Sequence, residues 1–195
     1  MRVIIKLIGT SPLLMHNAQL SDPEHPISRA IAELTSKVEK TAEDHREISR
    51  LEFCGSLYVG KGGPVMPAAN LQKCFSNAAK IRREGKSVER ALLPVGLDFP
   101  LQYSGPRTAE ELWADDTYHF RVPVRVGRAR VMRMRPRFPV WGIESEWELV
   151  DDMFDLSKLK RCGNEAGLVE GLGDARNKGF GRFTCEIIQA MRAAA

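Results

Sequence analysis

The sequence lacks any long apolar run. No stretch of its 195 residues approaches the roughly 18 consecutive apolar residues that a membrane-spanning helix needs. The amino terminus also lacks the apolar segment and the small-residue cleavage site of a signal peptide. We therefore expect a cytoplasmic protein with no membrane partner.

Cysteine is scarce and dispersed. The four cysteines form no Cys-x-x-Cys pair and have no histidine at metal-ligand spacing; they are Cys54, Cys74, Cys162 and Cys185. Zinc sites and disulfide frameworks both need such patterns. We therefore expect buried free thiols, no metal and no other cofactor.

The composition is that of an ordinary globular protein, with 43% hydrophobic and 28% charged residues. The length fits one domain over residues 1–195. A formal net charge of +4 is modest, so the distribution of charge along the chain says more about partners than the total does.

Four glycines near the end of the chain define its most distinctive segment. Gly171 and Gly173 form one Gly-x-Gly pair, Gly179 and Gly181 form a second, and Arg176 and Lys178 lie between the pairs. Glycine has no Cβ, so such a loop can adopt positive φ and bring its N–H groups close to a phosphate. The alternative is a mobile turn between a helix and a strand.

A second distinctive stretch runs from Arg121 to Arg137. It holds no acidic residue and seven arginines: Arg121, Arg125, Arg128, Arg130, Arg133, Arg135 and Arg137. Their alternation shifts along the stretch, which predicts a turn at Gly127 and a bulge or bend near residues 131–133. We interpret the stretch as a basic strand face for a nucleic-acid backbone, because arginine binds phosphate in bidentate fashion. The alternative is a surface strand face paired with Glu144, Glu146 and Glu148.

Hydrophobic periodicity gives the order of the elements. An apolar run predicts a central strand at residues 2–9, and helical spacing covers residues 27–53. A cap-like pattern at residues 41–44 leaves one helix or two open. Other strands are expected at residues 56–59, 98–103 and 183–188, and two or three more within residues 118–150. Helices are expected at residues 67–83, 108–113 and 155–168, and a loop is expected at residues 84–90. With residues 20–53 as a helical insertion, the order is βαββαβ, an α+β, ferredoxin-like (RRM-like) antiparallel sheet.

This order and the glycine loop together resemble the RAMP superfamily, the ferredoxin-like RNA-binding proteins of CRISPR systems. Residues 171–181 fit that family's Gly-φ-Gly-x5-Gly-φ-Gly loop, where φ is hydrophobic, and the opening strand followed by Ser11-Pro12-Leu13-Leu14 is similar to its start. The resemblance implies a backbone-type member, because only one ferredoxin-like unit is expected here. Residues 13–17, parts of 130–136 and Trp141 are also similar to proteins of bacteriophage and prophage genomes, which would place the protein in the bacterial host cytoplasm.

The leading hypothesis is non-catalytic binding of single-stranded RNA or DNA, with homo-oligomers assembling along the strand. The expected nucleic-acid-binding residues are His16, Arg128, Arg130, Arg133, Arg135, Trp141, Gly171, Gly173, Arg176, Lys178, Gly179 and Gly181. One alternative is a metal-independent endoribonuclease, because guide-processing members of the family place a catalytic histidine early in the chain, where His16 lies. Another is a phage protein that binds a host defence complex through the arginines of residues 121–137.

Overall fold

The computed structural model describes residues 1–127, 129–150 and 152–190. The strands are β1 (Arg2–Gly9), β2 (Leu13–Leu14), β3 (Val59–Gly60), β4 (Gly63–Pro67), β5 (Leu92–Pro94), β6 (Asp98–Gln102), β7 (His119–Val126), β8 (Ala129–Phe138), β9 (Gly142–Leu149) and β10 (Phe183–Gln189). The helices are α1 (Pro26–Ser36), α2 (Ala42–Ser56), α3 (Ala68–Ala79), α4 (Gly85–Ala91), α5 (Ala109–Ala114) and α6 (Leu156–Glu165). The architecture is α+β with an antiparallel main sheet, as expected.

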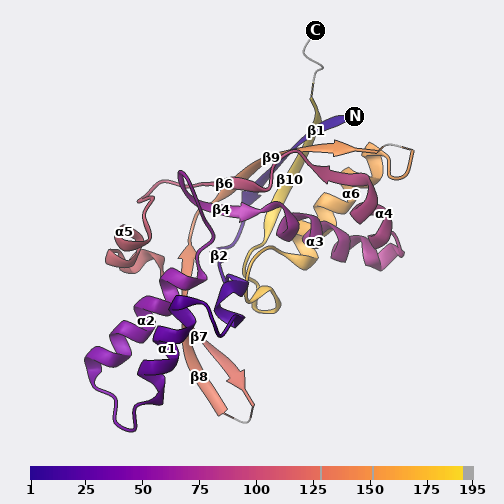
Figure 1. The fold of residues 1–195 in the computed structure, drawn as a ribbon. Helices are drawn as coiled ribbons and strands as arrows, with labels where there is room; N and C mark the ends of the chain where they lie inside the picture. The colour runs from indigo at the N-terminus through magenta and orange to yellow at the C-terminus, as the bar shows by residue number, and fades with distance from the viewer. Residues whose placement is uncertain (128, 151, 191–195) are drawn as a thin grey trace.

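The main sheet has the strand order β10-β1-β9-β6-β4-β3, and β5 pairs with β9. Helices α3, α4 and α6 gather on one side of it (Figure 1). Because side chains alternate along a strand, β1 buries Val3, Ile5 and Leu7 in the core. The prediction that β1 is an interior strand is confirmed, since it lies between β9 and β10.

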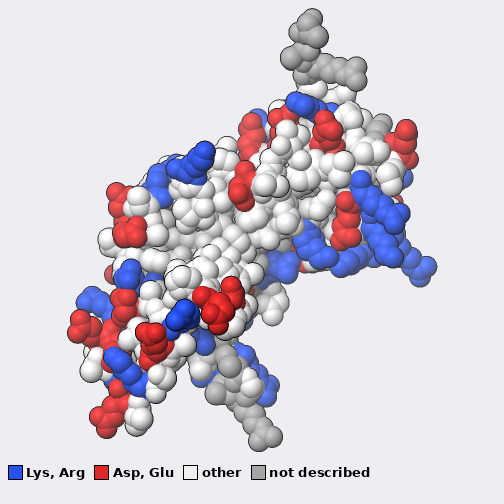
Figure 2. Space-filling model, in the orientation of Figure 1, with Lys and Arg blue, Asp and Glu red and all other residues white. Residues whose placement is uncertain are grey.

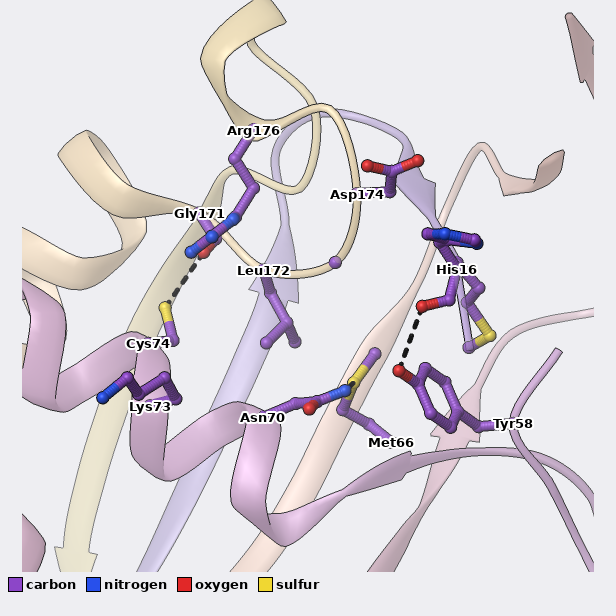
Figure 3. A pocket seen from close by; sticks show the side chains of 12 residues that line it. His16, Tyr58, Met66, Asn70, Lys73, Cys74, Gly171, Leu172, Asp174 and Arg176 are labelled. Carbon is purple, nitrogen blue, oxygen red and sulfur yellow. Dashed lines mark hydrogen bonds between the residues drawn. The ribbon is translucent and has the colours of Figure 1, made fainter. Parts of the chain in front are cut away.

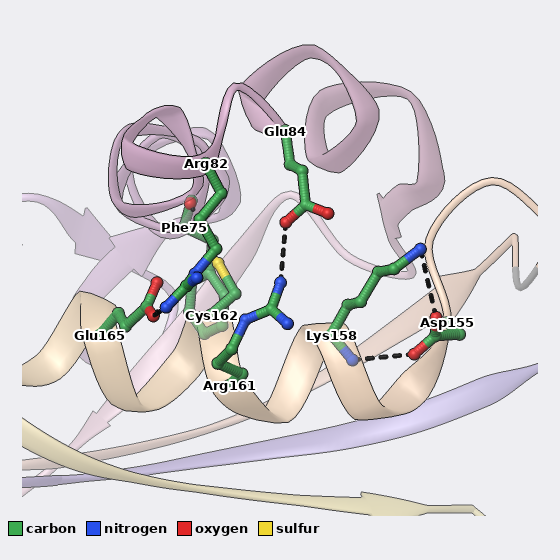
Figure 4. Close-up of polar contacts among 8 residues, drawn as sticks. All are labelled: Phe75, Arg82, Glu84, Asp155, Lys158, Arg161, Cys162 and Glu165. Atoms are coloured by element: carbon green, nitrogen blue, oxygen red, sulfur yellow. Dashed lines mark hydrogen bonds and ion pairs between the residues drawn. The ribbon is translucent and has the colours of Figure 1, made fainter.

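Polar contacts join α6 to the region of α3 and α4 (Figure 4). Arg82 pairs with Glu165 at 2.7 Å, and Arg161 pairs with Glu84 at 2.9 Å. The buried thiol of Cys162 donates to the carbonyl of Phe75 at 3.2 Å. These polar contacts add to the apolar core, which includes Phe75, Val88 and Leu159 of the same three helices.

The alternate residues of β1 and β9 form a charged sheet face. Arg2 lies 3.1 Å from Glu146 and 3.6 Å from Glu148, and Lys6 lies 3.2 Å from Glu144. The alternative that these glutamates pair with the arginines of residues 121–137 is therefore wrong, because β9 and that stretch belong to different sheets.

Strands β7 and β8 form a hairpin that projects away from the main sheet (Figure 1) and pairs with β2. The turn expected at Gly127 is confirmed, with a φ of +58°. The bulge expected near residues 131–133 is wrong, because the pairing register is constant from His119–Pro136 to Val126–Ala129. Because the ladder is regular, the shift in the spacing of the arginines places some of them on one face of the hairpin and the others on the opposite face.

The helical insertion consists of two helices, which resolves the alternative left open by the sequence. Thr41 and Asp44 form a reciprocal capping box at the start of α2. Helix α2 continues to Ser56 and the next strand begins only at Val59, so the strand expected at residues 56–59 is wrong.

The loop expected at residues 84–90 is also wrong. This segment forms α4, which buries Val88 and Ala91. Their spacing of three residues places them on one helical face, and the polar residues between them obscured that pattern. Among the described residues, no helix is long and apolar enough to span a membrane.

Candidate functional site

The glycine loop connects the end of α6 to β10. A π-helical turn, Ala166–Glu170, extends α6, and the four motif glycines that follow all have positive φ: +76° at Gly171, +81° at Gly173, +87° at Gly179 and +69° at Gly181. Most side chains are strained in this left-handed region. The glycines are therefore required by the path of the backbone.

Three of these glycines also allow a close approach of the chain to itself. A Cβ at Gly173 would overlap the carbonyl oxygen of Leu14, and a Cβ at Gly181 would overlap that of Leu172. A Cβ at Gly171 would lie 3.0 Å from the carbonyl oxygen of Phe180. At Gly179, by contrast, no atom lies within 4 Å of the added Cβ.

Several amides of the loop donate hydrogen bonds within the chain. Leu172 donates to Gly181, Asp174 to Leu14 and Gly181 to Pro12, each at 2.8 Å, and Gly171 donates to Ala166 at 2.8 Å. These amides are therefore not free to donate to a ligand. A ligand at this loop would contact the side chains of the loop, and not the phosphate-binding amides expected from the sequence.

The loop and the hairpin are held together by three different contacts. Arg135 Nε lies 3.1 Å from a carboxylate oxygen of Asp174, and Lys178 Nζ donates to the carbonyl of Pro123 at 3.1 Å. The rings of Phe120 and Phe180 meet edge-on with centroids 4.9 Å apart. The two distinctive segments of the sequence thus lie side by side.

Three depressions meet around the glycine loop, and we refer to them together as the loop groove. The first, about 210 Å³, lies between α3 and the loop (Figure 3). The second, about 430 Å³, lies between the helical insertion and the hairpin and shares His16 and Asp174 with the first. The third, about 460 Å³, lies outside the loop and shares Gly173, Asp174 and Arg176 with the first.

The carboxylates that line the loop groove are paired with arginines. Glu52 binds Arg133, and its other oxygen accepts the amide of Met134 at 2.8 Å. Glu170 lies 2.6 Å from Arg176, and Asp174 pairs with Arg135. Arg182 adds positive charge to the lining, and so does Lys73, which pairs with Glu89 outside the groove at 3.3 Å. After these pairings the groove retains a basic excess.

His16 lies where the first two depressions meet. Its side chain is near Asp174, and its backbone carbonyl accepts a hydrogen bond of 3.1 Å from the hydroxyl of Tyr58 (Figure 3). Although His16 is an exposed residue, partial burial of the imidazole lowers its pKa, and the positive charge of Arg135 lowers it further. The ring is therefore mostly neutral at neutral pH.

The other expected site residues of the hairpin include an exposed arginine. Arg130 lies on the same hairpin face as Arg121 and Arg125, and we call this the arginine face. Among the described residues, none of these three forms an ion pair with a carboxylate. Figure 2 shows basic side chains along the projecting hairpin at the bottom of the view. Arg128 lies outside the described residues.

Two expected contacts need correction. Trp141 is only 2% exposed, and its indole N–H donates to the carbonyl of Ser11 at 2.8 Å, so it is a core residue that cannot stack on a base in this arrangement. The Arg135 side chain is 7% exposed and joins the hairpin to the loop. Trp141 therefore lies beneath the site, whereas Arg135 lines the second depression with the small exposed part of its side chain.

Sequence reasoning missed Tyr58, Asn70 and Lys73, which line the first depression with His16. Asn70 and Lys73 are three residues apart on α3, so they share a helical face. That spacing could have been recognised in the sequence. The contact between Tyr58 and His16 could not, because it depends on how the chain folds back after α2. The described residues contain no group of three or more His, Cys, Asp or Glu side chains suited to a metal ion.

Comparison with known proteins adds no family assignment. No protein-family model matches the chain, and no curated protein gives a significant match.

Proposed function

We propose that the protein binds single-stranded nucleic acid, RNA or DNA, along the loop groove and the neighbouring arginine face, without cleaving it. The observation that carries the proposal is the continuity of the groove, because its three depressions share lining residues. A single strand needs such an extended path, with cations for its phosphates and partly apolar walls for its bases.

The charge distribution supports the same proposal. The carboxylates of the groove are paired with arginines, and the adjacent hairpin presents Arg121, Arg125 and Arg130. The charged face of β1 and β9 carries three glutamates against Arg2 and Lys6. A polyanion would therefore favour the groove and the hairpin over the sheet face that RRM-like proteins use.

A ferredoxin-like core related to the RAMP superfamily is part of the proposal. Leaving out the insertion, the β7–β8 hairpin, strands β2 to β5 and helices α4 and α5, the elements β1, α3, β6, β9, α6 and β10 follow the βαββαβ order. The neighbouring positions β10-β1-β9-β6 agree with that arrangement, and the motif glycines lie between α6 and β10. A backbone-type role with copies assembled side by side along one strand follows from the resemblance.

The test begins with the absorbance ratio at 260 and 280 nm of the freshly purified protein, before and after nuclease treatment. Fluorescence anisotropy with labelled single-stranded RNA and DNA then gives the affinity as a function of salt. If about five cations contact phosphates, log K falls with log salt at a slope of roughly −3 to −4. A slope near zero, or no binding to either strand, would overturn the proposal.

A metal-independent ribonuclease is the second candidate, because His16, Tyr58 and Lys73 line one depression. A neutral imidazole can accept a proton from a ribose 2′-hydroxyl, and a cation can stabilise the developing phosphorane charge. On this candidate, the His16→Ala variant retains RNA binding but loses cleavage of a hairpin RNA in EDTA. Intact RNA after incubation with the unaltered protein, across a panel of hairpins, would exclude it.

A further inference from the structure

The first depression of the loop groove has the size of one aromatic ring system. Its volume is about 210 Å³. A cavity of about 150 Å³ in another protein accommodates benzene. The pocket between α3 and the glycine loop therefore has room for one heterocyclic base, and we call it the base pocket.

The walls of the base pocket combine apolar and polar side chains. Met15 and Met66 are fully buried residues of the core, and Leu172 of the glycine loop is almost so. Tyr58 contributes its ring on the side of His16 (Figure 3). An aromatic ring forms favourable contacts with a planar base.

One neutral amide lies among these apolar groups. Asn70 projects from α3 into the pocket (Figure 3), and its side chain forms a weak hydrogen bond of 3.6 Å from Nδ2 to the sulfur of Met66. Within the described part of the chain, its Oδ1 acceptor and its second N–H have no partner. A carboxamide with a free donor beside a free acceptor matches the hydrogen-bonding edge of a base.

We propose that this pocket takes one unstacked nucleobase of the bound strand, which Asn70 recognises through its edge while the half-buried ring of Tyr58 contacts the base. Lys73 and Arg176, which also line the pocket, are placed to meet the flanking phosphates. The inference rests on the proposed function and goes beyond it, because it assigns base recognition to a particular residue.

The experiment compares a short single-stranded DNA with a strand of equal length whose sugars carry no bases. Anisotropy gives the affinity of both for the unaltered protein and for Asn70→Leu, which keeps the side-chain volume and removes the amide. We expect Asn70→Leu to weaken binding of the base-containing strand about tenfold, the effect of one good base contact. Binding of the abasic strand should change little.

The matched control is Asn164→Leu, the same substitution at an exposed position of α6 outside the loop groove. Circular dichroism and thermal unfolding check that both variants are folded. Equal losses for both strands, or no loss for either, would refute the base pocket while leaving strand binding intact. Failure of the unaltered protein to bind the base-containing DNA and an RNA of the same sequence would instead remove the proposed function itself.

Discussion

Arg135 and Asp174 lie 39 positions apart in the chain and 3.1 Å apart in the structure, and they join the arginine-rich hairpin to the glycine loop. The guanidinium is almost fully buried, whereas Asp174 is about one-third exposed and lines all three depressions of the loop groove. The ion pair therefore sets the position of the hairpin relative to the groove.

The Asp174→Asn variant should lower the free energy of unfolding by about 2–4 kcal/mol, because it leaves the buried guanidinium of Arg135 without a carboxylate. Urea unfolding at neutral pH measures the change. Glu165→Gln is the control: it breaks the more exposed pair with Arg82 and should cost no more than about 1 kcal/mol. Equal losses for the two variants would contradict the structural role of the Arg135–Asp174 pair.

The motif glycines should differ in their tolerance of alanine. Gly181→Ala should destabilise by at least about 3 kcal/mol, because its Cβ would overlap the backbone of Leu172. Gly179→Ala has open space around the new methyl group and should cost only the about 1–2 kcal/mol of a left-handed backbone. Thermal unfolding distinguishes the two, and similar melting temperatures would show that the loop repacks freely.

The sequence was informative where a local pattern has one physical solution. The turn at Gly127 and the apolar run of β1 each specify their structure, whereas the capping pattern at Thr41 and Asp44 left one helix or two open. The sequence was misleading at the arginine-rich stretch. The alternation of residues along a strand shows which side chains share a face, but it does not show which other segments pack against that face. Glu52 and Asp174 reach Arg133 and Arg135 through tertiary contacts between distant segments.

The same limit applies to Trp141 and to the base pocket. An aromatic residue near basic residues fits either a stacking platform or a core position, and only the burial of Trp141 distinguishes them. The base pocket combines residues from the segment after β2, from Tyr58, from α3 and from the glycine loop. No single stretch of sequence carries the signal of that assembly.

Replacing the arginine face should reduce both the affinity for single strands and its dependence on salt. The triple variant Arg121→Gln, Arg125→Gln, Arg130→Gln removes three cations, so the slope of log K against log salt should decrease in magnitude by about 2. Anisotropy titrations over a range of salt concentrations give the slope.

The control for the arginine face removes the same charge elsewhere, with Lys86, Arg90 and Lys160 each replaced by glutamine. These three residues are exposed on α4 and α6, outside the loop groove. An equal reduction by the two triple variants would mean that net charge, and not the arginine face, governs binding.

His16 should make strand binding dependent on pH. Because burial and the charge of Arg135 lower its pKa below 6.5, the free protein carries a neutral imidazole at pH 7.5 and gains the proton only as the pH falls below the usual histidine range. A phosphate bound beside the ring favours the imidazolium. Affinity should therefore rise on acidification, by up to about tenfold for each pKa unit by which the bound strand raises the pKa of His16.

The comparison for this prediction is His16→Gln, measured by anisotropy between pH 7.5 and pH 5. Any general gain in positive charge affects both proteins, so the ratio of their affinities isolates His16. His45→Gln, an exposed histidine of α2 that does not line the groove, should behave like the unaltered protein. A constant affinity ratio between the unaltered protein and His16→Gln would place the bound phosphates away from the imidazole and move the strand toward Arg176 and the arginine face.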